Sequence, residues 1–494
     1  MNYPFWDVPH IGSGWVIGLI AIFHVLVSHF AIGGGFYLVV AERKLLRNKR
    51  ADWFEALRRH SKFFFILTGV YGAVTGVGIW FSIGLANPEG TSTLIHNFVF
   101  GWAIEWTFFI TEITATAAAV YYYTWGRVSD RLHMTIGWIY AISAWLSLVI
   151  INGILTFMLT PGPGWLSVAG TGNEASMFWN AFFNPTYWPS LIVRTLICIS
   201  LAGVWALLTS SRLDGYKQPE LKTDVVRWSC KWLLPSFILL PASMMWYLYM
   251  VPEGRRELLQ IGIGTIGQGV FTHVTRAVLV SVMASATIAV VVYFLAYRSP
   301  RSFGFGHAFG VLLLALAATA STEHAREMLR KPYVIAEHMF SNGIRKSDVA
   351  KFNSEGYLTH SPWATDADRE LWAKIDAAGA GAVLAADSTA PELAAAQLKR
   401  GELMLRGQCL ACHTRDAYRA FKSLLAGRDR ESIGNILKML HDYKDDSPYK
   451  AYMPPLVGTS SEIEALGDCL ARLVETKAAD AATGVDKVAL ATQP

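Results

Sequence analysis

The sequence predicts an all-α membrane protein: a polytopic bundle of about eight transmembrane helices followed by a small all-α domain. Of the 494 residues, 53% are hydrophobic and only 16% are charged, whereas about a quarter are charged in typical soluble domains. From residue 13 to residue 325 the chain repeats apolar runs of about 20 residues, which is the length a helix needs to cross a bilayer. From residue 341 onward it is polar and rich in alanine, so we expect a domain boundary near residue 340.

The apolar runs define the expected transmembrane helices and their orientation. They occupy residues 13–41, 62–86, 95–125, 134–159, 187–209, 231–251, 268–297 and 305–328. Lysine and arginine are present in the first, third, fifth and seventh connections and absent from the second and fourth; the sixth, with Arg255 and Arg256, is an exception. Because basic connections stay in the cytoplasm, both termini are expected on the periplasmic side of a bacterial inner membrane. No cleavable signal peptide is expected at residues 1–14, which lack a basic start and a small-residue cleavage site.

The net charge of +5 comes mainly from these cytoplasmic connections. It gives no indication of nucleic acid binding, and the lipid bilayer is the expected surrounding of residues 1–340.

Only one cysteine pair has the spacing of a chemical motif. Cys409, Cys412 and His413 form CxxCH, in which two thiols attach to a haem and the adjacent histidine binds its iron. Met453 follows forty residues after His413 and is the expected second axial ligand. An amphipathic helix with a serine-led, glutamate-containing start comes next. A chance match or an incomplete zinc site is the alternative.

This order of elements resembles small class I cytochromes c, over about residues 395–475, and we assign residues 395–478 to this domain. A haem with two protein ligands has no open position on its iron, so we expect it to carry electrons only. Haem c is attached outside the cytoplasm, which agrees with the predicted orientation. Residues 341–394 are expected to be a linker with a short helix at Asp366–Ile375, and residues 479–494 a disordered tail. We expect Cys469 to be a buried apolar side chain.

Ionisable residues in apolar helices cost about 2.5–3.5 kcal/mol on insertion scales, so each one needs a reason. Glu105 and Glu112 are seven residues apart and share one helix face. Two carboxyl groups in one apolar stripe indicate iron ligands or proton carriers. A hydrogen bond to a neighbouring helix is the alternative for either residue.

Two further groups of ionisable residues stand out. Glu323, Glu327 and Arg330 share one face at the outer end of the last span, with His324 beside them; an interfacial ion-pair ladder is the alternative. His24 precedes Gly33–Gly35, where missing side chains would leave room for a large flat ligand. His29 lies about 140° round the helix from His24, so the two cannot serve one site alike, and His29 is equally well explained as a core residue.

Four segments together resemble subunit I of the cytochrome bd oxidases, over about residues 11–335. They are AIFHVLVSHFAIGGGF, AIEWTFFITE, RLHMTIGWIYAISAWLSLVIINGILTFMLTP and REMLRKPY. The resemblance implies haem b and/or haem d in the bundle, two in number, at which dioxygen is reduced to water. It implies that His24 is an axial ligand of one high-spin haem and Glu327 the carboxylate at the other. Glu105 and Glu112 match paired acids that ligate haem iron or deliver protons, with a spacing one residue off the usual pattern. Arg330 matches an arginine near haem propionates, and Arg276 also matches.

Departures from the family pattern are equally informative. Arg194 replaces the family's low-spin haem histidine, and Val278 falls where its methionine ligand would be. The quinol-binding loop is reduced to VPEGRRELLQIGIGTIGQG, and the cytochrome c domain replaces a ninth helix. We therefore expect electrons to come from a periplasmic carrier through haem c instead of from quinol. The alternative is a non-catalytic cytochrome subunit that wires electrons within a larger respiratory complex. A membrane partner subunit or a homodimer is expected, and roles for His29, His273 and His324 stay open.

Overall fold

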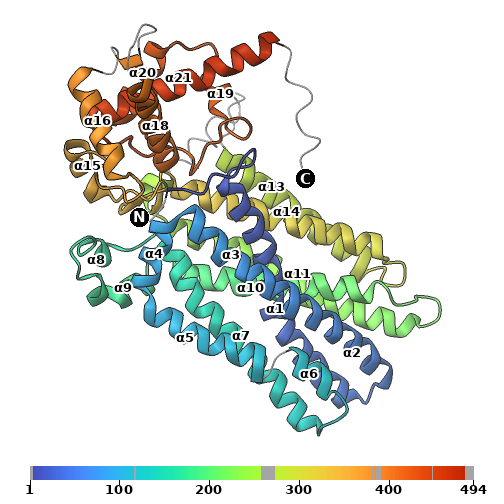
Figure 1. The fold of residues 1–494 in the computed structure, drawn as a ribbon. Helices are drawn as coiled ribbons and strands as arrows, with labels where there is room; N and C mark the ends of the chain where they lie inside the picture. Colours follow the sequence, from blue (N-terminus) through green and yellow to red (C-terminus); the bar gives the residue numbers. More distant parts are fainter. Residues whose placement is uncertain are drawn as a thin grey trace. The chain divides into compact units, whose positions relative to one another are not determined.

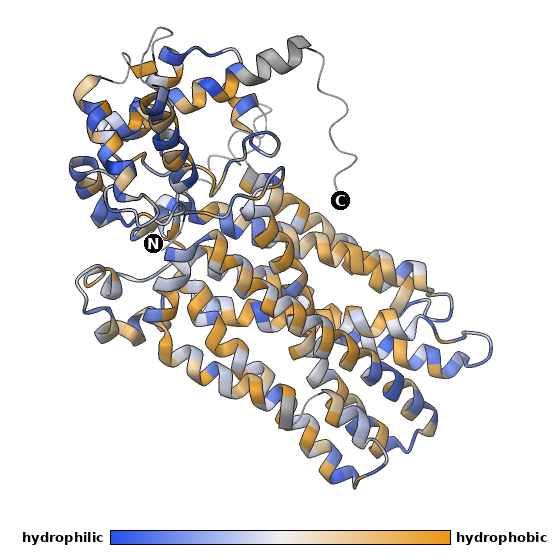
Figure 2. Ribbon diagram, in the orientation of Figure 1, coloured by the Kyte–Doolittle hydropathy of each residue, from blue (hydrophilic) through white to orange (hydrophobic). Residues whose placement is uncertain are grey.

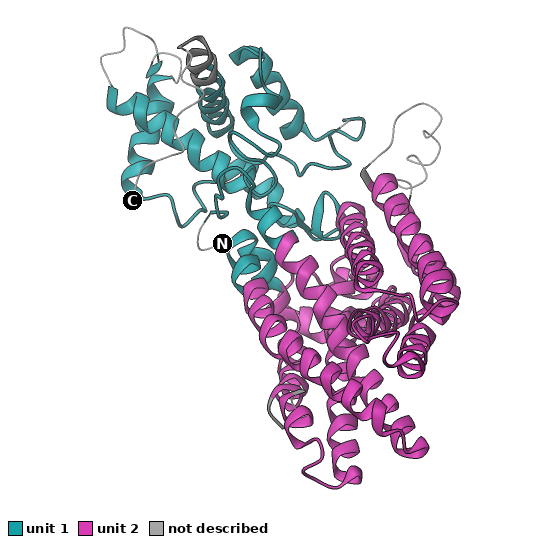
Figure 3. Ribbon diagram, turned by 90° about the vertical axis from the view of Figure 1, so that its right-hand side faces the viewer, with its two compact units in different colours: residues 1–18, 81–93, 331–494 teal, residues 19–80, 94–330 magenta. Residues whose placement is uncertain are grey.

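The computed structural model describes residues 4–115, 118–256, 273–379, 383–384, 391–447 and 449–483. Within these ranges the regular secondary structure is almost entirely helical (Figure 1), which confirms the predicted all-α class. The strands in the described part are β1 (Tyr333–Ile335) and β2 (Met339–Phe340), which form one short antiparallel pair. The chain divides into two compact units, coloured separately in Figure 3. Unit 1 comprises residues 1–18, 81–93 and 331–494, and unit 2 comprises residues 19–80 and 94–330.

Unit 2 is built from long apolar helices (Figure 2). In chain order these and their connecting elements are α1 (Ser13–Asn48), α2 (Ala51–Ile66), η1 (Leu67–Gly72), α3 (Ala73–Ala86), α4 (Pro88–Asn97), α5 (Val99–Ile110), η2 (Thr111–Ala115), α6 (Ala118–Thr124), α7 (Asp130–Phe157), α8 (Pro163–Leu166), η3 (Glu174–Met177), α9 (Phe178–Phe182), α10 (Tyr187–Ser210), α11 (Pro219–Met250), α13 (His273–Val291), η5 (Val292–Tyr297) and α14 (Phe305–Arg330). The ends of α1, α3 and α4 extend into unit 1.

Seven helices in the described residues are long and apolar enough to cross a membrane: Ser13–Asn48, Ala51–Ala86, Asp130–Phe157, Tyr187–Ser210, Pro219–Met250, Val274–Tyr297 and Phe305–Arg330. They coincide with seven of the eight predicted spans. The remaining span, 95–125, corresponds to the end of α4 followed by α5, η2 and α6. No described piece of it reaches 18 residues, because the helix is interrupted at Phe98 and residues 116–117 lie outside the described part of the chain.

Glycines bring the helices of unit 2 close together. A methyl group on Gly33 of α1 would lie 1.9 Å from the carbonyl oxygen of Cys198 in α10. One on Gly203 of α10 would lie 2.9 Å from the carbonyl oxygen of Ser229 in α11. The most buried of the seven spans is α10. On the outer helices large apolar side chains such as Val74, Phe100 and Ile238 are exposed, as expected for surfaces that face lipid.

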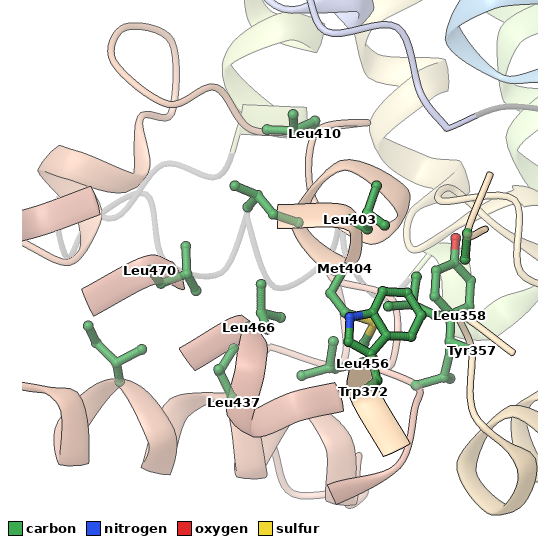
Figure 4. Close-up of a cluster of buried hydrophobic side chains, with 14 of the residues drawn as sticks. Tyr357, Leu358, Trp372, Leu403, Met404, Leu410, Leu437, Leu456, Leu466 and Leu470 are labelled. Carbon is green, nitrogen blue, oxygen red and sulfur yellow. The ribbon is translucent and has the colours of Figure 1, made fainter. Parts of the chain in front are cut away.

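Unit 1 contains β1, β2 and a set of shorter helices, namely η6 (Lys346–Asp348), α15 (Val349–Glu355), α16 (Asp366–Ala378), α18 (Pro391–Gln408), α19 (Phe421–Leu424), α20 (Arg430–Asp442) and α21 (Ser460–Thr483). Its core includes Tyr357, Trp372, Met404 and Leu466 (Figure 4). Helices α18 and α21 pack closely at Gly401, where a methyl group would lie 2.0 Å from the carbonyl oxygen of Ala465.

Residues 341–394, expected to be a linker, supply part of this core. Helix α16 coincides with the short helix expected at Asp366–Ile375. Tyr357, Leu358 and Trp372 are buried with the core residues of α18 and α21. The carboxylate of Glu462 on α21 accepts hydrogen bonds from the backbone amides of Tyr357 and Leu358 at 2.9 and 2.8 Å. Burial of these large side chains is why the segment packs onto the unit. In the segment 479–494, α21 continues to Thr483, and the expected disordered tail otherwise lies outside the described residues.

Candidate haem sites

The CxxCH motif begins directly after α18 ends. Backbone bonds from Cys412 and His413 to the carbonyl of Cys409, each 3.1 Å, close a tight turn. Gln408 fixes this turn from the preceding position: its Nε2 donates to the carbonyl of Val457 at 2.8 Å, and its Oε1 accepts from the Val457 amide at 3.0 Å. The motif is therefore tied to the segment that carries Met453, four residues before Val457.

His413 has the orientation expected of an iron ligand. Its Nδ1 lies 3.0 Å from the carbonyl oxygen of Arg419. A carbonyl only accepts hydrogen bonds, so Nδ1 carries the proton and Nε2 keeps a lone pair for a metal. The ring also packs against Phe421, with 4.8 Å between centroids. Burial lowers the pKa of His413, partly opposed by the hydrogen bond to Arg419, which favours the neutral form that iron requires.

The sulfur atoms of unit 1 have distinct surroundings. Burial raises the pKa of Cys409 to about 12, whereas the Sγ of Cys412 lies 3.8 Å from the Lys331 ammonium group. Met453 is half-buried, and its carbonyl accepts from the Tyr443 hydroxyl at 3.1 Å. Cys469 is half-buried on α21, 3.9 Å from Glu402, and burial raises its pKa to about 12. One histidine, two thiols at fixed spacing and a thioether fit a covalently attached haem.

The loop after the motif packs on the beginning of the chain, which belongs to the same unit. Arg415 donates to Asp7 at 3.3 and 3.2 Å, and the Tyr418 amide donates to the carbonyl of His10 at 3.0 Å. The Tyr418 ring meets Trp15 of α1 edge-on, with 5.6 Å between centroids. The loop that follows the CxxCH motif therefore contacts the first turn of α1.

His24, nine residues further along α1, also has a defined tautomer. Its Nδ1 lies 3.1 Å from the hydroxyl oxygen of Thr75 on α3. That hydroxyl donates its own proton to the carbonyl of Tyr71 at 2.8 Å, so it accepts from His24, and Nε2 keeps its lone pair. The absence of a side chain at Gly76 makes room for the imidazole: a methyl group there would lie 3.2 Å from Cε1. The arrangement fits an axial haem ligand.

Gly33–Gly35 do not leave room for a flat ligand, contrary to the sequence-based expectation. A methyl group on Gly34 would collide with the rings of Phe64 and Phe30, and one on Gly35 with the ring of Tyr140. Neighbouring helices fill the space that the missing side chains leave.

Glu105 and Glu112 both face α7, which agrees with their predicted common face. Glu105 accepts a hydrogen bond from the Ser147 hydroxyl at 2.8 Å, and Glu112 accepts from the Tyr140 hydroxyl at 3.2 Å. Glu112 lies on the π-helical η2, a type of segment that is frequent at functional sites. Each acid therefore keeps further acceptor positions beyond its one hydroxyl partner.

The acids of α14 form ion pairs. Arg330, which is buried, donates through Nη2 to both oxygens of Glu327 at 2.6 and 2.5 Å, and through Nη1 to the sulfur of Met158 at 3.2 Å. Glu323 binds Arg326 at 2.9 Å and lies 3.8 Å from Arg194 of α10. The structure thus brings Glu327 and Arg330 together and pairs Arg194 with Glu323.

The other predicted residues have different surroundings, and His29 interacts electrostatically with Arg194 and Glu323. Arg276 and His324 are exposed, and the side chain of His273 lies outside the described residues. His29 is buried, and its Nδ1 donates to the carbonyl of Val25 at 2.8 Å. Within the described ranges no three or more His, Cys, Asp or Glu side chains converge as a metal cluster, although a haem needs only one or two axial ligands.

Sequence reasoning missed the partners that orient these groups: Thr75, Tyr140, Ser147 and Arg326. A signal was present for two of them. Tyr140 and Ser147 are seven residues apart on an apolar helix, the same spacing as Glu105 and Glu112. No signal identified Thr75, because its role depends on how α3 packs against α1.

Residues 13–246, a little under half of the chain, match the family model described as cytochrome bd terminal oxidase subunit I. This segment ends before Glu327 and Arg330, so the resemblance of REMLRKPY stays a prediction. The solved structure of bd oxidase from Geobacillus thermodenitrificans is similar with a TM-score of 0.53 and 16% identity, over 65% of this chain and 87% of that chain. No curated protein matches the chain. The membrane-spanning part of this chain is therefore similar in sequence to subunit I of the cytochrome bd oxidases and similar in fold to a bd oxidase.

Proposed function

We propose that this chain is a bd-type membrane haem oxidoreductase that takes electrons through a haem c on Cys409, Cys412 and His413 and reduces dioxygen in the bundle. The bundle haems, of type b and/or d, would supply the iron at which dioxygen takes up four electrons and four protons to give two water molecules. His24, Glu105 and Glu327 are the proposed iron ligands in the bundle, and His413 and Met453 those of haem c. The proposal places the chain in a bacterial inner membrane, with unit 1 in the periplasm and a membrane partner subunit or a second copy beside the bundle.

One observation supports the proposed route by which electrons enter. The loop that follows the CxxCH motif packs on Asp7, His10 and Trp15, at the start of the helix that bears His24. A domain tethered only by a flexible linker would not need such contacts. An attached haem in this loop would therefore be held at one end of α1, where a periplasmic carrier protein could deliver electrons to it.

Arg194 supports the loss of quinol as the direct donor. A guanidinium group has no lone pair to offer a metal, and Arg194 is buried within 3.8 Å of Glu323. Arg194 occupies the position at which the resemblance expects a haem-ligating histidine, and there its positive charge is neutralised by Glu323. The residues of the shortened sixth connection from 257 onward lie outside the described part of the chain.

Glu112 and Glu105 are the proposed proton carriers. Both face α7, one bound to Tyr140 and the other to Ser147. A hydroxyl group can pass a proton on by donating with one bond and accepting with another. Two acids on one face, each touching a hydroxyl, would hold protons close to the reacting oxygen.

The test is to purify the full chain from membranes, with its partner if one co-purifies, and measure pigments and oxygen consumption together. Pyridine haemochrome spectra should show haem c together with b or d haem, and a reduced periplasmic cytochrome c should support oxygen uptake. Cys409→Ser with Cys412→Ser should remove covalent haem and abolish uptake, while Cys469→Ser should keep both. His24→Ala should lower the bundle haem content and leave haem c in place.

The alternative, a non-catalytic cytochrome subunit, gives a different spectrum. If carbon monoxide leaves the reduced bundle haems unchanged, none of them has an open position and the oxidase proposal is wrong. A shift of a high-spin band with carbon monoxide supports catalysis. Haem c alone, with no pigment in the bundle, would contradict both versions.

A further inference from the structure

Arg194 is a buried arginine whose guanidinium group forms no hydrogen bond within the described residues. It is 8% exposed on α10, and the nearest carboxylate oxygen, Oε1 of Glu323, lies 3.8 Å from its Nη2, which is too far for a hydrogen bond. A guanidinium group carries five N–H donors. Buried donors in native proteins almost always have a partner. We therefore expect a partner for Arg194 that the protein side chains do not supply.

Arg326 of α14 also keeps an unused donor. Its Nε donates to Oε2 of Glu323 at 2.9 Å, while its Nη1 is buried without a hydrogen-bond partner in the described residues. Arg194 and Arg326, called the arginine pair below, thus approach the two oxygens of one carboxylate from different helices. Unused donors on both members of the pair indicate that an acceptor is bound beside Glu323.

The charges of this group do not balance. Glu323 supplies one negative charge for the two positive charges of the arginine pair. Its other electrostatic neighbour is His29, which cannot supply a negative charge. Glu327 also interacts with Arg326, but both oxygens of Glu327 bind Arg330, which offsets their charge. One positive charge is left over, so the missing acceptor should be an anion of single charge.

The excess charge lies inside the apolar part of the bundle. Arg194 is seven residues after the start of α10 at Tyr187, and Glu323 is seven residues before the end of α14 at Arg330. Both positions are about 10 Å from the predicted periplasmic ends of their helices, at 1.5 Å per residue. An uncompensated charge at this depth is costly. A bound anion would remove that cost.

His29 relates the arginine pair to the proposed haem ligand on α1. It interacts electrostatically with Arg194, with Glu323 and with His24. A haem held by His24 carries two propionate groups, each a carboxylate of single charge, at the edge of its ring. These are the anions that the proposed function itself brings into the bundle.

The guanidinium group of Arg330, which the resemblance places near haem propionates, is largely occupied. Its Nη2 donates to both oxygens of Glu327, and its Nη1 donates to the sulfur of Met158. Only Nε is buried without a partner. A carboxylate binds a guanidinium group best through two parallel N–H bonds, which a single Nε donor cannot offer. Arg194 has every donor available for such a pair of bonds.

We propose that Arg194 and Arg326 bind one carboxylate group, supplied by a propionate of the bundle haem. The carboxylate accepts from Arg194 and from Nη1 of Arg326, while Glu323 holds the two guanidinium groups in position. The position at which the resemblance expects an iron-ligating histidine thereby contacts the edge of a haem instead of its iron. The inference rests on the bundle haem of the proposed function. A small free carboxylate such as acetate has the same chemistry and is the other possible source.

The main test compares Arg194→Met with Arg43→Met in the purified full chain, together with its partner if one co-purifies. Arg43 is an exposed residue near the end of α1, so its replacement removes the same charge without touching the arginine pair. A nearby positive charge favours the reduced haem, because reduction adds an electron. Arg194→Met should lower the ratio of reduced to oxidised bundle haem at a fixed potential by about tenfold, or about 59 mV for a one-electron couple. Equal midpoint potentials of the bundle haem in the two variants would overturn the proposal.

A second readout reports on the carboxylate itself. Haem labelled with carbon-13 in its propionate carboxyl groups gives an infrared band that no protein carboxylate shares. This band should shift in Arg194→Met and in Arg194→Lys, because both replacements remove the paired N–H bonds, and it should not shift in Arg43→Met. Arg194→Lys keeps the positive charge and is the deciding variant if Arg194→Met loses its pigment. A purely structural role for Arg194 would leave the labelled band of a pigmented Arg194→Lys protein unchanged, and that result overturns the propionate assignment.

Acetate distinguishes the two sources of the carboxylate. In the pigmented protein sodium acetate should have no effect beyond that of sodium chloride at equal ionic strength, because the propionate fills the site. An acetate-dependent change in the bundle haem spectrum that Arg194→Met abolishes would assign the site to a free carboxylate and overturn the propionate assignment.

The full chain without bundle haem, produced in haem-starved cells, tests the site apart from the proposed function. There acetate should raise the melting temperature of the unaltered chain and not that of Arg194→Met, since a ligand that binds only the folded state stabilises it. This result would keep the carboxylate site even if the protein never binds a haem in the bundle. A melting temperature that acetate leaves unchanged in both chains would overturn the site.

Discussion

Arg415 forms an ion pair with Asp7, more than four hundred residues away in the sequence. The same guanidinium group binds Glu402 of α18, with Nη1 at 2.9 Å from Oε2. Hydrogen bonds to Glu402 raise the pKa of Arg415 despite its partial burial. Arg415 thereby joins the CxxCH loop both to the helix before it and to the segment that leads into α1.

Loss of this pair should loosen unit 1 measurably. Asp7→Asn should lower the free energy of unfolding by about 0.5–1 kcal/mol, because the two side chains are about one-third exposed and Glu402 remains. Arg415→Met should cost about 1–3 kcal/mol, since both acids lose their partner. Thermal unfolding in detergent, followed by circular dichroism, measures both. Asp416→Asn, which breaks a half-exposed pair with Lys422, is the control and should change stability by less than about 0.5 kcal/mol.

Gly401→Ala should separate α18 from α21. The new methyl group would lie 2.0 Å from the Ala465 carbonyl oxygen and 2.6 Å from Cβ of Cys469. Neither atom can move without moving the helix, so we expect a loss of about 1–3 kcal/mol or more. Gly434→Ala in α20 is the matched control: there a methyl group meets only the end of the Arg430 side chain at 3.2 Å. Equal melting temperatures for the two variants would contradict the close packing at Gly401.

The sequence predicts the apolar helices of unit 2 better than the short elements of unit 1, because the two regions are stabilised in different ways. Lipid demands long apolar helices, so hydropathy located the seven spans that the structure contains in its described residues. The helices between residues 341 and 483 are shorter and less apolar, so hydropathy is a weaker signal there. A linker was therefore expected at residues 341–394, although Tyr357 and Trp372 in this segment are buried together with residues of α18 and α21.

The candidate site shows the same division. Motif spacing predicts His413 as a candidate, and costly charges in apolar helices predict Glu105, Glu112 and Glu327 as candidates. Their partners depend on which helices become neighbours, and one sequence does not determine that. Gly33–Gly35 were misinterpreted for this reason: an absent side chain can admit a ligand or another helix, and here it admits Phe64, Tyr140 and the backbone of α10.

Acid should weaken unit 1 through Asp368. Burial alone would raise the pKa of this carboxyl group, but hydrogen bonds from Lys399 and Thr365 outweigh burial and lower it below the ordinary value of 3.8. A lowered pKa in the folded state means that the carboxylate stabilises the fold above pH 3.8 and that this contribution disappears as the pH falls further.

Asp368→Asn should therefore cost about 1–3 kcal/mol at neutral pH, because it breaks the capping box of α16 and the contact with Lys399. The difference from the unaltered protein should shrink as the pH is lowered. Unfolding free energy measured against pH checks both points. The control is Asp366→Asn, at a position that is 94% exposed; its unfolding free energy should change with pH in parallel with that of the unaltered protein. If the difference in unfolding free energy between Asp368→Asn and the unaltered protein is the same at every pH, the charge of Asp368 is not involved.

Thr75→Val should disturb the bundle haem without removing its proposed ligand. Valine keeps the shape of threonine but cannot accept the Nδ1 proton of His24, so the imidazole loses the bond that fixes its tautomer and ring orientation. Such supporting bonds typically contribute about 10–100-fold to metal affinity. The ratio of bundle haem to haem c in pyridine haemochrome spectra should therefore fall in Thr75→Val. The Thr75→Ser variant, which keeps the hydroxyl, should have the ratio of the unaltered protein. Thr107→Val on α5 is the control, since that hydroxyl binds only the carbonyl of Ala103 in its own helix. A histidine whose Nδ1 loses its hydrogen-bond acceptor cannot hold iron as firmly as before. If Thr75→Val and Thr107→Val keep the same haem ratio and the same spectrum, then Thr75 does not orient an iron ligand and His24 is a packing residue.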